Sequence, residues 1–461
     1  MFNLSCLSKQ SSLFCLNEKS ISGEQFLNDI AHYRQKIQTF IGSPIFLARE
    51  AKSQPQVILF HADVYQFSVR LFALAAEKIT VILPANGQSK TLEGLFPIAD
   101  AIAGDFPRDI AFTSIEGYQA DPLKLASERT TTTLLWPTNS SIIFSTSGSS
   151  GQAKLVKKSW QQLSIELATL NTTFVLERDT VFLSTVSHQH IYGLLFRLLW
   201  PISQGAKIAQ TIEYPEHGIQ VLTQFTSVVL VSSPAFLKRL VLDNVLASQK
   251  GNFHQIFSSG GPLADNDAIE LYQQFSKSIT QVYGSTETGG IGYRSVNKLP
   301  AAKWQVFSGI CLAVEPNTQR FRLNSPYVSE SNMLLDDKGE LFDNGQFSLL
   351  GRVDRTIKLE EKRLNLDEVE QHLLLSPLIN ECRIMVLKNN RSSLAAVVSL
   401  TEEGLALKKS LSAFAFNQRL KQHLLERFER VCLPRKWRYL DQLPYNSQGK
   451  LSHSALEALF E

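Results

Sequence analysis

Residues 142–154 read Ile142-Ile-Phe-Ser-Thr146-Ser-Gly-Ser-Ser-Gly-Gln-Ala-Lys154, an apolar run followed by a loop rich in hydroxyl groups and glycine. Glycine lets successive backbone N–H groups turn toward one point, while hydroxyls and an ammonium add further donors. This set of donors suits a polyphosphate. The loop is not a Walker loop, which needs Gly-Lys-Ser/Thr in direct succession, and a polar surface loop is the alternative interpretation. The donors are Thr146, Ser147, Gly148, Ser149, Ser150, Gly151 and Lys154.

The length and the composition indicate a globular protein of more than one domain. A chain of 461 residues exceeds what one hydrophobic core usually serves. Apolar residues make up 44% and charged residues 19%, which is ordinary for such proteins. The net charge of +3 is too small to indicate nucleic acid or an anionic membrane surface as a partner.

Cysteine usage and hydropathy predict a cytoplasmic protein. The five cysteines are scattered and never form a Cys-x-x-Cys pair, so neither disulfides nor a cysteine-based zinc site is expected. No apolar run approaches the roughly 18 residues that a membrane span needs. The N-terminal residues lack a basic segment followed by a continuous apolar one, so we expect no signal peptide.

Short β-branched runs alternate with helical patterns from about residue 56 to 350. This alternation predicts βαβ units and a largely parallel sheet, in which ligands collect at the carboxyl ends of strands. One helix is expected after Ser159 as N-cap, with Leu163, Leu167 and Leu170 on one face. Loops 146–154, 258–263 and 283–289 follow or end expected strands. The expected strands are 57–60, 80–83, 142–145, 181–184, 228–231, 256–258 and 279–282.

The pattern changes after about residue 350. Residues 351–358 are polar and charged, helical patterns follow at 366–373 and 420–431, and residues 384–387 and 395–400 are expected to be strands. We therefore expect an α/β protein with a large N-terminal domain of layered sheets and helices (1–350) and a small α+β domain (351–461).

Further motifs follow the first loop in a fixed order. They are His188-Gln-His190-Ile-Tyr-Gly193, Ser258-Ser-Gly-Gly-Pro-Leu263, Val282-Tyr-Gly-Ser-Thr-Glu-Thr-Gly-Gly290, Gly351-Arg-Val-Asp354 and Leu443-Pro-Tyr-Asn-Ser-Gln-Gly-Lys450. With the loop at 146–154, this series resembles the adenylate-forming acid–thiol ligases, the superfamily of acyl-CoA synthetases, peptide-synthetase adenylation domains and luciferases. The resemblance covers roughly residues 50 to 461, and the order of the motifs is more specific than any single one.

The resemblance implies an ATP site. Residues 146–154 would cover the β and γ phosphates, although Ala153 stands where proline is usual. Gly260, Gly261 and Pro262 would form the adenine-side loop, where glycine allows the backbone to approach a flat base; an ordinary turn is the alternative. In the His-x-x-Gly element, His190 would face the acyl substrate, although a histidine after a strand is more often structural.

The segment 282–290 carries the most specific of the later expectations. By resemblance, Tyr283 would stack on adenine beside Gly284, Thr286 would donate to the α-phosphate, and Glu287 would hold Mg²⁺. A hard cation takes oxygen ligands and bridges carboxylate and phosphate, so one carboxylate suffices. Taken alone, Glu287 would be read as a solvated surface carboxylate.

The remaining implied residues lie near the border of the second domain and beyond it. Asp337 would bind ribose, although Leu335-Asp336 replaces the usual Thr-Gly before it. Arg352 would contact the ribose hydroxyls, and Asp354 would be the pivot of a mobile C-terminal domain. Arg363 would close the loop that helps to receive the thiol, although Glu361 replaces a glycine there.

Lys450, in the C-terminal signature, would enter the adenylation site. Without that signature, a lysine so near the end of a chain would be read as solvent-exposed. Pro444 and Gly449 at matching offsets favour the functional interpretation.

These residues predict an AMP-forming acid–thiol ligase. A carboxylic acid would react with ATP and Mg²⁺ to give acyl-AMP and pyrophosphate, and the acyl group would pass to CoA or to the phosphopantetheine of an acyl carrier protein. The alternatives are a non-thiol acceptor, a luciferase-like oxygenase, and a non-catalytic nucleotide- or acyl-binding paralogue. The substrate pocket is expected around His190, Ser232-Ser-Pro234 and Gly260, whose apolar walls suit aryl and fatty acids.

Overall fold

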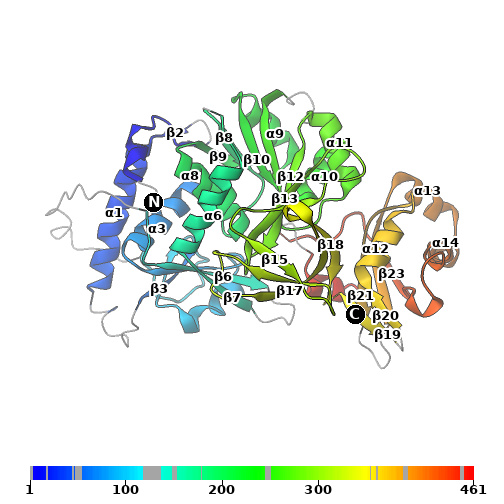
Figure 1. Ribbon diagram of the computed structural model, residues 1–461. Coiled ribbons are helices and arrows are strands. Elements are labelled where there is room, and N and C mark those ends of the chain that lie inside the picture. The colour runs from blue at the N-terminus through cyan, green and yellow to red at the C-terminus, as the bar shows by residue number, and fades with distance from the viewer. Residues whose placement is uncertain are drawn as a thin grey trace.

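The computed structural model (Figure 1) combines two large sheets, flanking helices and a separate C-terminal sheet. This confirms the α/β class. It describes residues 4–16, 19–43, 46, 54–117, 136–147, 153–177, 179–243, 251–353, 355–359, 362–387, 393–446 and 451–461.

The first sheet has five strands in the order β5-β3-β4-β6-β7. All are parallel except β7, which runs antiparallel to β6. The expected strands 57–60, 80–83 and 142–145 are confirmed here, whereas β7 was not expected. The bounds are β3 (Gln56–Phe60), β4 (Thr80–Leu83), β5 (Ala101–Gly104), β6 (Ser141–Ser147) and β7 (Ala153–Ser159).

The second sheet has thirteen strands, and its parallel half contains the other four expected strands. The expected parallel strands are therefore divided between two sheets, which agrees with the layered sheets predicted for the large domain. The physical reason is helix α6 (Trp160–Thr173), which begins at the Ser159 cap and buries Trp160, Leu163, Leu167 and Leu170 in a core shared by both sheets. The parallel strands are β8 (Val181–Ser184), β9 (Lys207–Thr211), β10 (Val228–Ser232), β11 (Phe253–Ser258) and β12 (Ile279–Ser285).

The other half of the thirteen-stranded sheet is antiparallel and was not expected from the sequence. The strand β12 pairs with parallel β11 on one side and with antiparallel β13 on the other, so the direction changes at β12. The antiparallel strands are β13 (Gly289–Val296), β14 (Trp304–Val306), β15 (Cys311–Val314), β16 (Arg320–Asn324), β17 (Met333–Phe342) and β18 (Gln346–Arg352). At the opposite edge lie β1 (Phe14–Leu16) and β2 (Lys19–Ile21).

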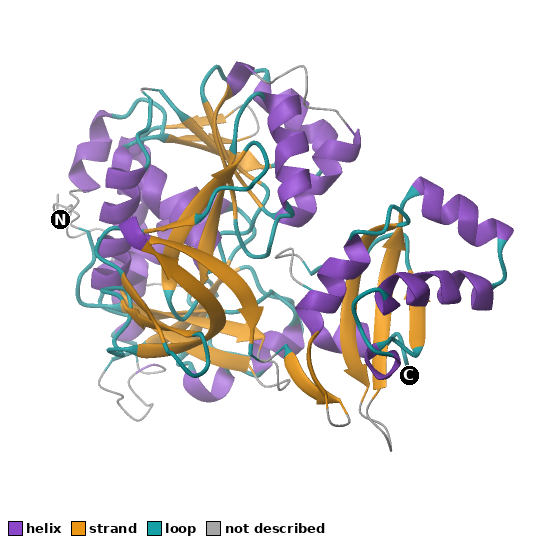
Figure 2. Cartoon of the chain, turned by 45° about the vertical axis from the view of Figure 1, so that its right-hand side comes forward, coloured by secondary structure: helices purple, strands orange, loops and turns teal. Residues whose placement is uncertain are grey.

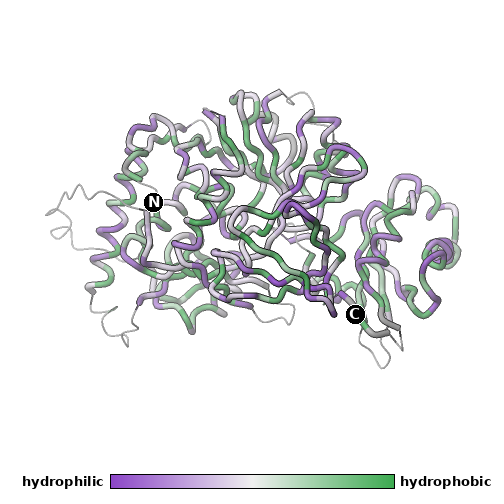
Figure 3. The backbone as a smooth tube through the Cα atoms, in the orientation of Figure 1, coloured by the Kyte–Doolittle hydropathy of each residue, from purple (hydrophilic) through white to green (hydrophobic). Residues whose placement is uncertain are grey.

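Helices cover the sheets, and apolar stretches run through the central strands (Figure 3). Among the described residues, none of the helices combines the length and the apolarity that crossing a bilayer requires. The helices before β18 other than α6 are α1 (Gly23–Ile41), α3 (Val64–Ala76), α4 (Ser89–Glu93), α7 (Ile191–Gly193), α8 (Trp200–Gln204), α9 (Pro215–Leu222), α10 (Pro234–Asp243) and α11 (Asp265–Phe275), with a π-helix at Leu194–Leu199.

The residues after β18 form a two-stranded sheet and a three-stranded sheet, and helices pack on both faces of the three-stranded sheet (Figure 2). The expected strands at 384–387 and 395–400 are confirmed within β21 (Ile379–Leu387) and β22 (Ser393–Leu400). Helix α14 ends at Leu425, so Phe428 and Val431 of the expected helical pattern lie beyond it. The other elements are β19 (Thr356–Leu359), β20 (Lys362–Asn365), β23 (Lys436–Tyr439), α12 (Leu366–Leu374), α13 (Glu402–Ser410), α14 (Ala413–Leu425) and α15 (His453–Glu457).

This C-terminal region has a hydrophobic core of its own, which includes Val369, Ile384 and Leu420. Its contacts with the larger body include an ion pair of 3.2 Å between Lys238 on α10 and Glu381 on β21. The strand β18 runs to Arg352, so the chain leaves the thirteen-stranded sheet just after the predicted boundary at 350. The division into two domains, 1–350 and 351–461, stays a prediction.

Candidate active site

The carboxyl ends of β8, β10, β11 and β12 lie at one edge of the thirteen-stranded sheet, because these strands are parallel neighbours. Side chains join the loops that leave this edge. The hydroxyls of Thr185 and Ser232 are 2.8 Å apart, and the Ser259 hydroxyl donates to the Val282 carbonyl over 2.9 Å. The loops after the expected strands 181–184, 228–231, 256–258 and 279–282 are therefore neighbours in space.

The loop 258–263 is anchored at both ends and exposed between them. Ser258 and Leu263 are buried, whereas Gly260, Gly261 and Pro262 are exposed. Gly260 has φ of +88°, a left-handed conformation that glycine adopts without the steric cost of a side chain. The exposed backbone of this loop is thus open to a flat ligand.

The segment 283–289 forms a tight turn between β12 and β13. A side chain at Gly284 would place its Cβ 2.2 Å from the Gly289 carbonyl oxygen, so the two strands approach as only glycine permits. The Ser285 N–H donates to the Thr288 hydroxyl over 2.9 Å, which fixes the turn. Thr286 and Glu287 lie half-buried at its tip.

The phosphate-binding loop expected at 146–154 lies between β6 and β7. Thr146 pairs with Lys154 and Ser147 with Ala153 in the antiparallel register, and the Thr146 hydroxyl donates to the Lys154 carbonyl over 3.2 Å. The structure thus describes the two ends of the loop. The expected donors Gly148, Ser149, Ser150 and Gly151, and the side chain of Ser147, lie outside the described residues.

Lys154 and Glu287 connect these two segments, which are far apart in the sequence and belong to different sheets. The Lys154 Nζ donates to Glu287 Oε1 over 2.7 Å. Burial alone would raise the pKa of Glu287, but the hydrogen bond and charge of Lys154 outweigh it, and the pKa falls below its ordinary value. An ionised carboxylate beside an ammonium is able to hold a divalent cation next to a phosphate.

Asp337 and Arg352 meet on adjacent strands. They are direct partners in the β17–β18 register, with Arg352 Nη1 at 3.6 Å from Asp337 Oδ2. Tyr283 is close to them: burial and the charge of Asp337 raise the pKa of its phenol. The Tyr283 ring also packs against Trp304 at 5.8 Å between centroids. The residues expected at adenine and ribose are therefore brought together.

The two histidines of the 188–193 segment differ in their surroundings. His188 is buried between neutral and cationic partners, with Nε2 at 2.9 Å from the His61 carbonyl and Nδ1 at 3.3 Å from Arg197 Nη1. Burial and the charge of Arg197 lower its pKa. His190 is half-buried at the N-cap position of α7. A structural role suits His188, and His190 stays the better candidate for a substrate contact.

Besides the donors at 147–151, three further expected residues are not placed by the structure. Asp354 and Lys450 lie outside the described residues, as does the side chain of Arg363 in β20. Near Lys450, Tyr445 and Leu451 form an isolated antiparallel bridge. The roles of these three residues stay predictions.

Two buried charged residues that contact the 283–289 turn and its end were not predicted from the sequence. Lys158 on β7 and Glu166 on α6 are both buried, and each hydrogen-bonds to the main chain of the turn. A signal was present in the sequence, because Lys158 follows Lys154 at a strand-like spacing and Glu166 interrupts the apolar face of α6.

Comparison with known proteins agrees with this geometry. The AMP-binding enzyme family matches residues 48–319, more than half of the chain. The chain is 25% identical over 276 residues to a D-alanine--D-alanyl carrier protein ligase from Staphylococcus aureus (strain bovine RF122 / ET3-1). That match takes in 53% of this chain and 55% of the relative, so the chain spans about half the length of the curated relatives it matches.

Solved structures share the fold over nearly the whole chain. ATP-bound MatB from Rhodopseudomonas palustris has a TM-score of 0.79 at 16% identity and covers 100% of this chain and 99% of its own. O-succinylbenzoate coenzyme A synthetase (MenE) from Bacillus subtilis, in complex with ATP and magnesium ion, has a TM-score of 0.77 at 16% identity, with 98% of both chains covered. The family match and the shared fold together lead to one conclusion: the chain belongs to the AMP-binding enzyme family.

Proposed function

We propose that this protein is an ATP-dependent acid–thiol ligase. It activates an aryl or fatty carboxylic acid as acyl-AMP with release of pyrophosphate, and then transfers the acyl group to the thiol of CoA or of a carrier-protein phosphopantetheine. The observation that carries the proposal is the 2.7 Å contact between Lys154 and Glu287, because it joins the end of a phosphate-type loop to a metal-type carboxylate. The Asp337–Arg352 pair beside Tyr283 supports a nucleoside site next to it.

The first step forms a bond between a substrate carboxylate oxygen and the α-phosphorus of ATP. The bond from that phosphorus to the bridging oxygen breaks, and pyrophosphate leaves with its electron pair. Such a transfer requires in-line positioning and positive charge near the departing oxygens. In the proposal, Glu287 would hold Mg²⁺, which with the ammonium groups of Lys154 and Lys450 would supply that charge, and the Thr286 hydroxyl would donate a hydrogen bond to the α-phosphate.

In the second step the thiol sulfur attacks the acyl carbon, AMP leaves, and the thiol proton passes to solvent. We assign the pivot between the two steps to Asp354, the ribose contact to Arg352 and the thiol side to Arg363. The name of the D-alanyl carrier protein ligase favours a carrier protein over CoA as acceptor. A cytoplasmic location is part of the proposal, supported by five free cysteines.

Hydroxamate trapping tests adenylation without knowledge of the acceptor. The protein is incubated with ATP, Mg²⁺, hydroxylamine and a panel of aryl and alkyl acids, and pyrophosphate and hydroxamate are measured. We expect both products with at least one acid of the panel. Nucleotide binding without acid-dependent pyrophosphate would instead identify a non-catalytic paralogue.

Lys450→Ala separates the two steps. We expect a loss of about a hundredfold or more in pyrophosphate release, because a positioned cation is removed, with little change in thioester formation from supplied acyl-AMP. Lys409→Ala, at an exposed lysine of α13, is the matched control. Equal losses in both steps would reject the role of Lys450.

A further inference from the structure

Lys158 is a buried lysine with an unusual set of partners. Only 2% of its surface is exposed, and its Nζ donates to the main-chain carbonyls of Glu287 and Tyr327 over 2.6 and 2.8 Å. A buried ammonium is costly unless it is fully hydrogen-bonded or paired. Burial lowers the pKa of Lys158 to about 8, although the charges of Glu166 and Glu287 oppose that shift.

Two lysines of strand β7, Lys154 and Lys158, contact Glu287. Lys154 and Lys158 are four positions apart in an extended strand, so their side chains leave the same face. Lys154 is 60% exposed and binds the carboxylate, while Lys158 binds the carbonyl of the same residue. Two lysines of one strand thus hold both the side chain and the main chain of Glu287.

Glu166, which lies on helix α6, binds the main chain at the end of the turn. Its Oε1 accepts a hydrogen bond from the Gly290 N–H over 2.7 Å. A Cβ on Gly289, whose φ is +70°, would lie 2.8 Å from Glu166 Oε2. The two glycines at 289 and 290 therefore make room for the Glu166 carboxylate, and Glu166 is buried.

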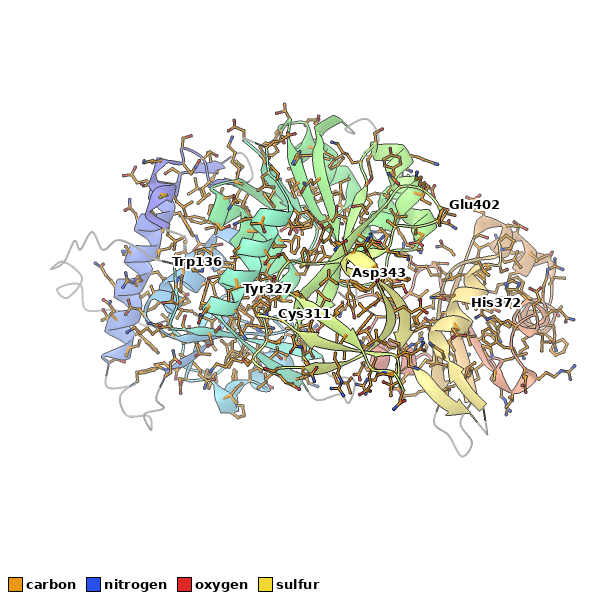
Figure 4. The ribbon with its side chains drawn as sticks, in the orientation of Figure 1. Trp136, Cys311, Tyr327, Asp343, His372 and Glu402 are labelled. Atoms are coloured by element: carbon orange, nitrogen blue, oxygen red, sulfur yellow. The ribbon has the colours of Figure 1, made fainter. Side chains whose placement is uncertain are left out.

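Tyr327 hydrogen-bonds both to Lys158 and to helix α6, the helix that carries Glu166. Its carbonyl accepts from Lys158, and its hydroxyl donates to the Thr169 hydroxyl over 2.7 Å. Figure 4 shows Tyr327 beside this helix. The turn, β7, α6 and the loop at Tyr327 are thereby joined through buried and partly buried hydrogen bonds.

We propose that Lys158 and Glu166 are positioning residues, which fix the main chain at the Glu287 carbonyl and at the Gly290 N–H and so hold the Glu287 carboxylate where Mg²⁺ and ATP bind. Packing alone would be served as well by apolar side chains of similar volume, which avoid the desolvation of two charges. Each of the two residues instead makes one hydrogen bond to the main chain between Glu287 and Gly290. The inference rests on the proposed function for the role of Glu287.

The first experiment measures how pyrophosphate release depends on Mg²⁺ concentration at saturating ATP. We expect Lys158→Met to raise the Mg²⁺ concentration at half-maximal rate by about tenfold or more, as loss of a group that orients a metal ligand does. Lys157→Met is the matched control, because Lys157 lies next on the same strand but is exposed, and it should leave this value unchanged. Unchanged Mg²⁺ dependence in folded Lys158→Met would overturn the proposal for Lys158.

Glu166 is tested by two substitutions that both remove its charge. Glutamine retains an oxygen that accepts from the Gly290 N–H, whereas leucine does not, so Glu166→Gln should keep a Mg²⁺ dependence close to the natural protein and Glu166→Leu should not. Equal behaviour of the two variants would reject positioning through this hydrogen bond.

Hydrogen exchange of peptides covering 284–291 provides a measurement independent of activity. Exchange in Glu166→Leu should be faster in these peptides than in Glu166→Gln, while peptides from β21 and β22 stay unchanged. If the natural protein released no pyrophosphate with any acid, the proposed function would fail, and the exchange rates would still decide whether Glu166 fixes the turn. Equal exchange in both variants, or faster exchange throughout the chain, would count against it.

Discussion

The hairpins β6–β7 and β12–β13 meet at the candidate site through Lys154 and Glu287. They differ in how their side chains and main chain are held. The described ends of the β6–β7 hairpin present the Thr146 hydroxyl and the exposed ammonium of Lys154. The β12–β13 turn is closed by the Ser285–Thr288 hydrogen bond and bound from beneath by Lys158 and Glu166. One side of the site thus supplies donors, while buried charges fix the main chain of the other. A preorganised main chain requires little rearrangement when charge develops on a ligand.

Glu287→Gln, at the contact between the two hairpins, should have the largest effect on activity. It keeps the turn and the volume of the side chain but removes the negative charge that faces Lys154. We expect acid-dependent pyrophosphate release to fall by about a hundredfold or more, roughly 3 kcal/mol. Glu340→Gln, at an exposed carboxylate of β17, should have no effect. A loss below about threefold would remove Glu287 from the chemistry.

The buried carboxyl beneath the turn predicts a pH dependence of stability. Burial raises the pKa of Glu166 to about 7, although the Gly290 hydrogen bond and Lys158 oppose that shift. Because the folded protein then binds more protons than the unfolded chain, this group makes the free energy of unfolding fall as pH rises from about 4.5 to about 7. The fall amounts to about 3 kcal/mol at most.

Urea unfolding across that pH range checks this expectation in a comparison with Glu166→Gln, which cannot ionise. The variant should gain stability relative to the natural protein as pH rises from about 4.5 to about 7, with no further gain above that. A constant difference between the two proteins would show that Glu166 titrates in the same way in the folded and unfolded chains.

Gly289→Ala distinguishes the close approach of Glu166 from simple backbone strain. Gly289 and Gly309 have φ of +70° and +81°, but only at Gly289 would a Cβ lie within 4 Å of other groups, at 2.8 Å from Glu166 Oε2. Gly309→Ala should cost about 1 kcal/mol from the left-handed conformation alone, and Gly289→Ala about 1–2 kcal/mol more. Equal shifts of the urea midpoint would mean that the carboxylate moves away freely.

Arg352→Lys has the smallest expected effect, because it alters the nucleoside side of the site and leaves both hairpins intact. Lysine keeps the charge beside Asp337 but loses the planar set of donors. We expect the KM for ATP to rise by about tenfold while kcat changes little, which marks binding lost equally from ground and transition states. A fall in kcat with unchanged KM would instead assign Arg352 to the transition state.

Local patterns in the sequence predicted the elements that local physics decides. The Ser159 cap and the apolar spacing of 163, 167 and 170 predicted α6, and β-branched runs predicted strands that occur in both sheets. The resemblance named Lys154 and Glu287, which do meet, and Asp337 and Arg352, which pair across strands. The antiparallel strands 289–352 were missed because their pairing is set by tertiary context rather than by local preference. Lys158 and Glu166 were missed because burial of a charged residue depends on partners distant in the sequence.

The ion pair between Lys238 on α10 and Glu381 on β21 links the C-terminal region to the rest of the molecule. Both side chains are partly accessible to water, so separating them costs about 1 kcal/mol or less. Dissolved salt screens such a pair and reduces that cost further. In the proposed motion about Asp354, the fraction of molecules in which the C-terminal region has turned away from α10 should therefore increase with ionic strength.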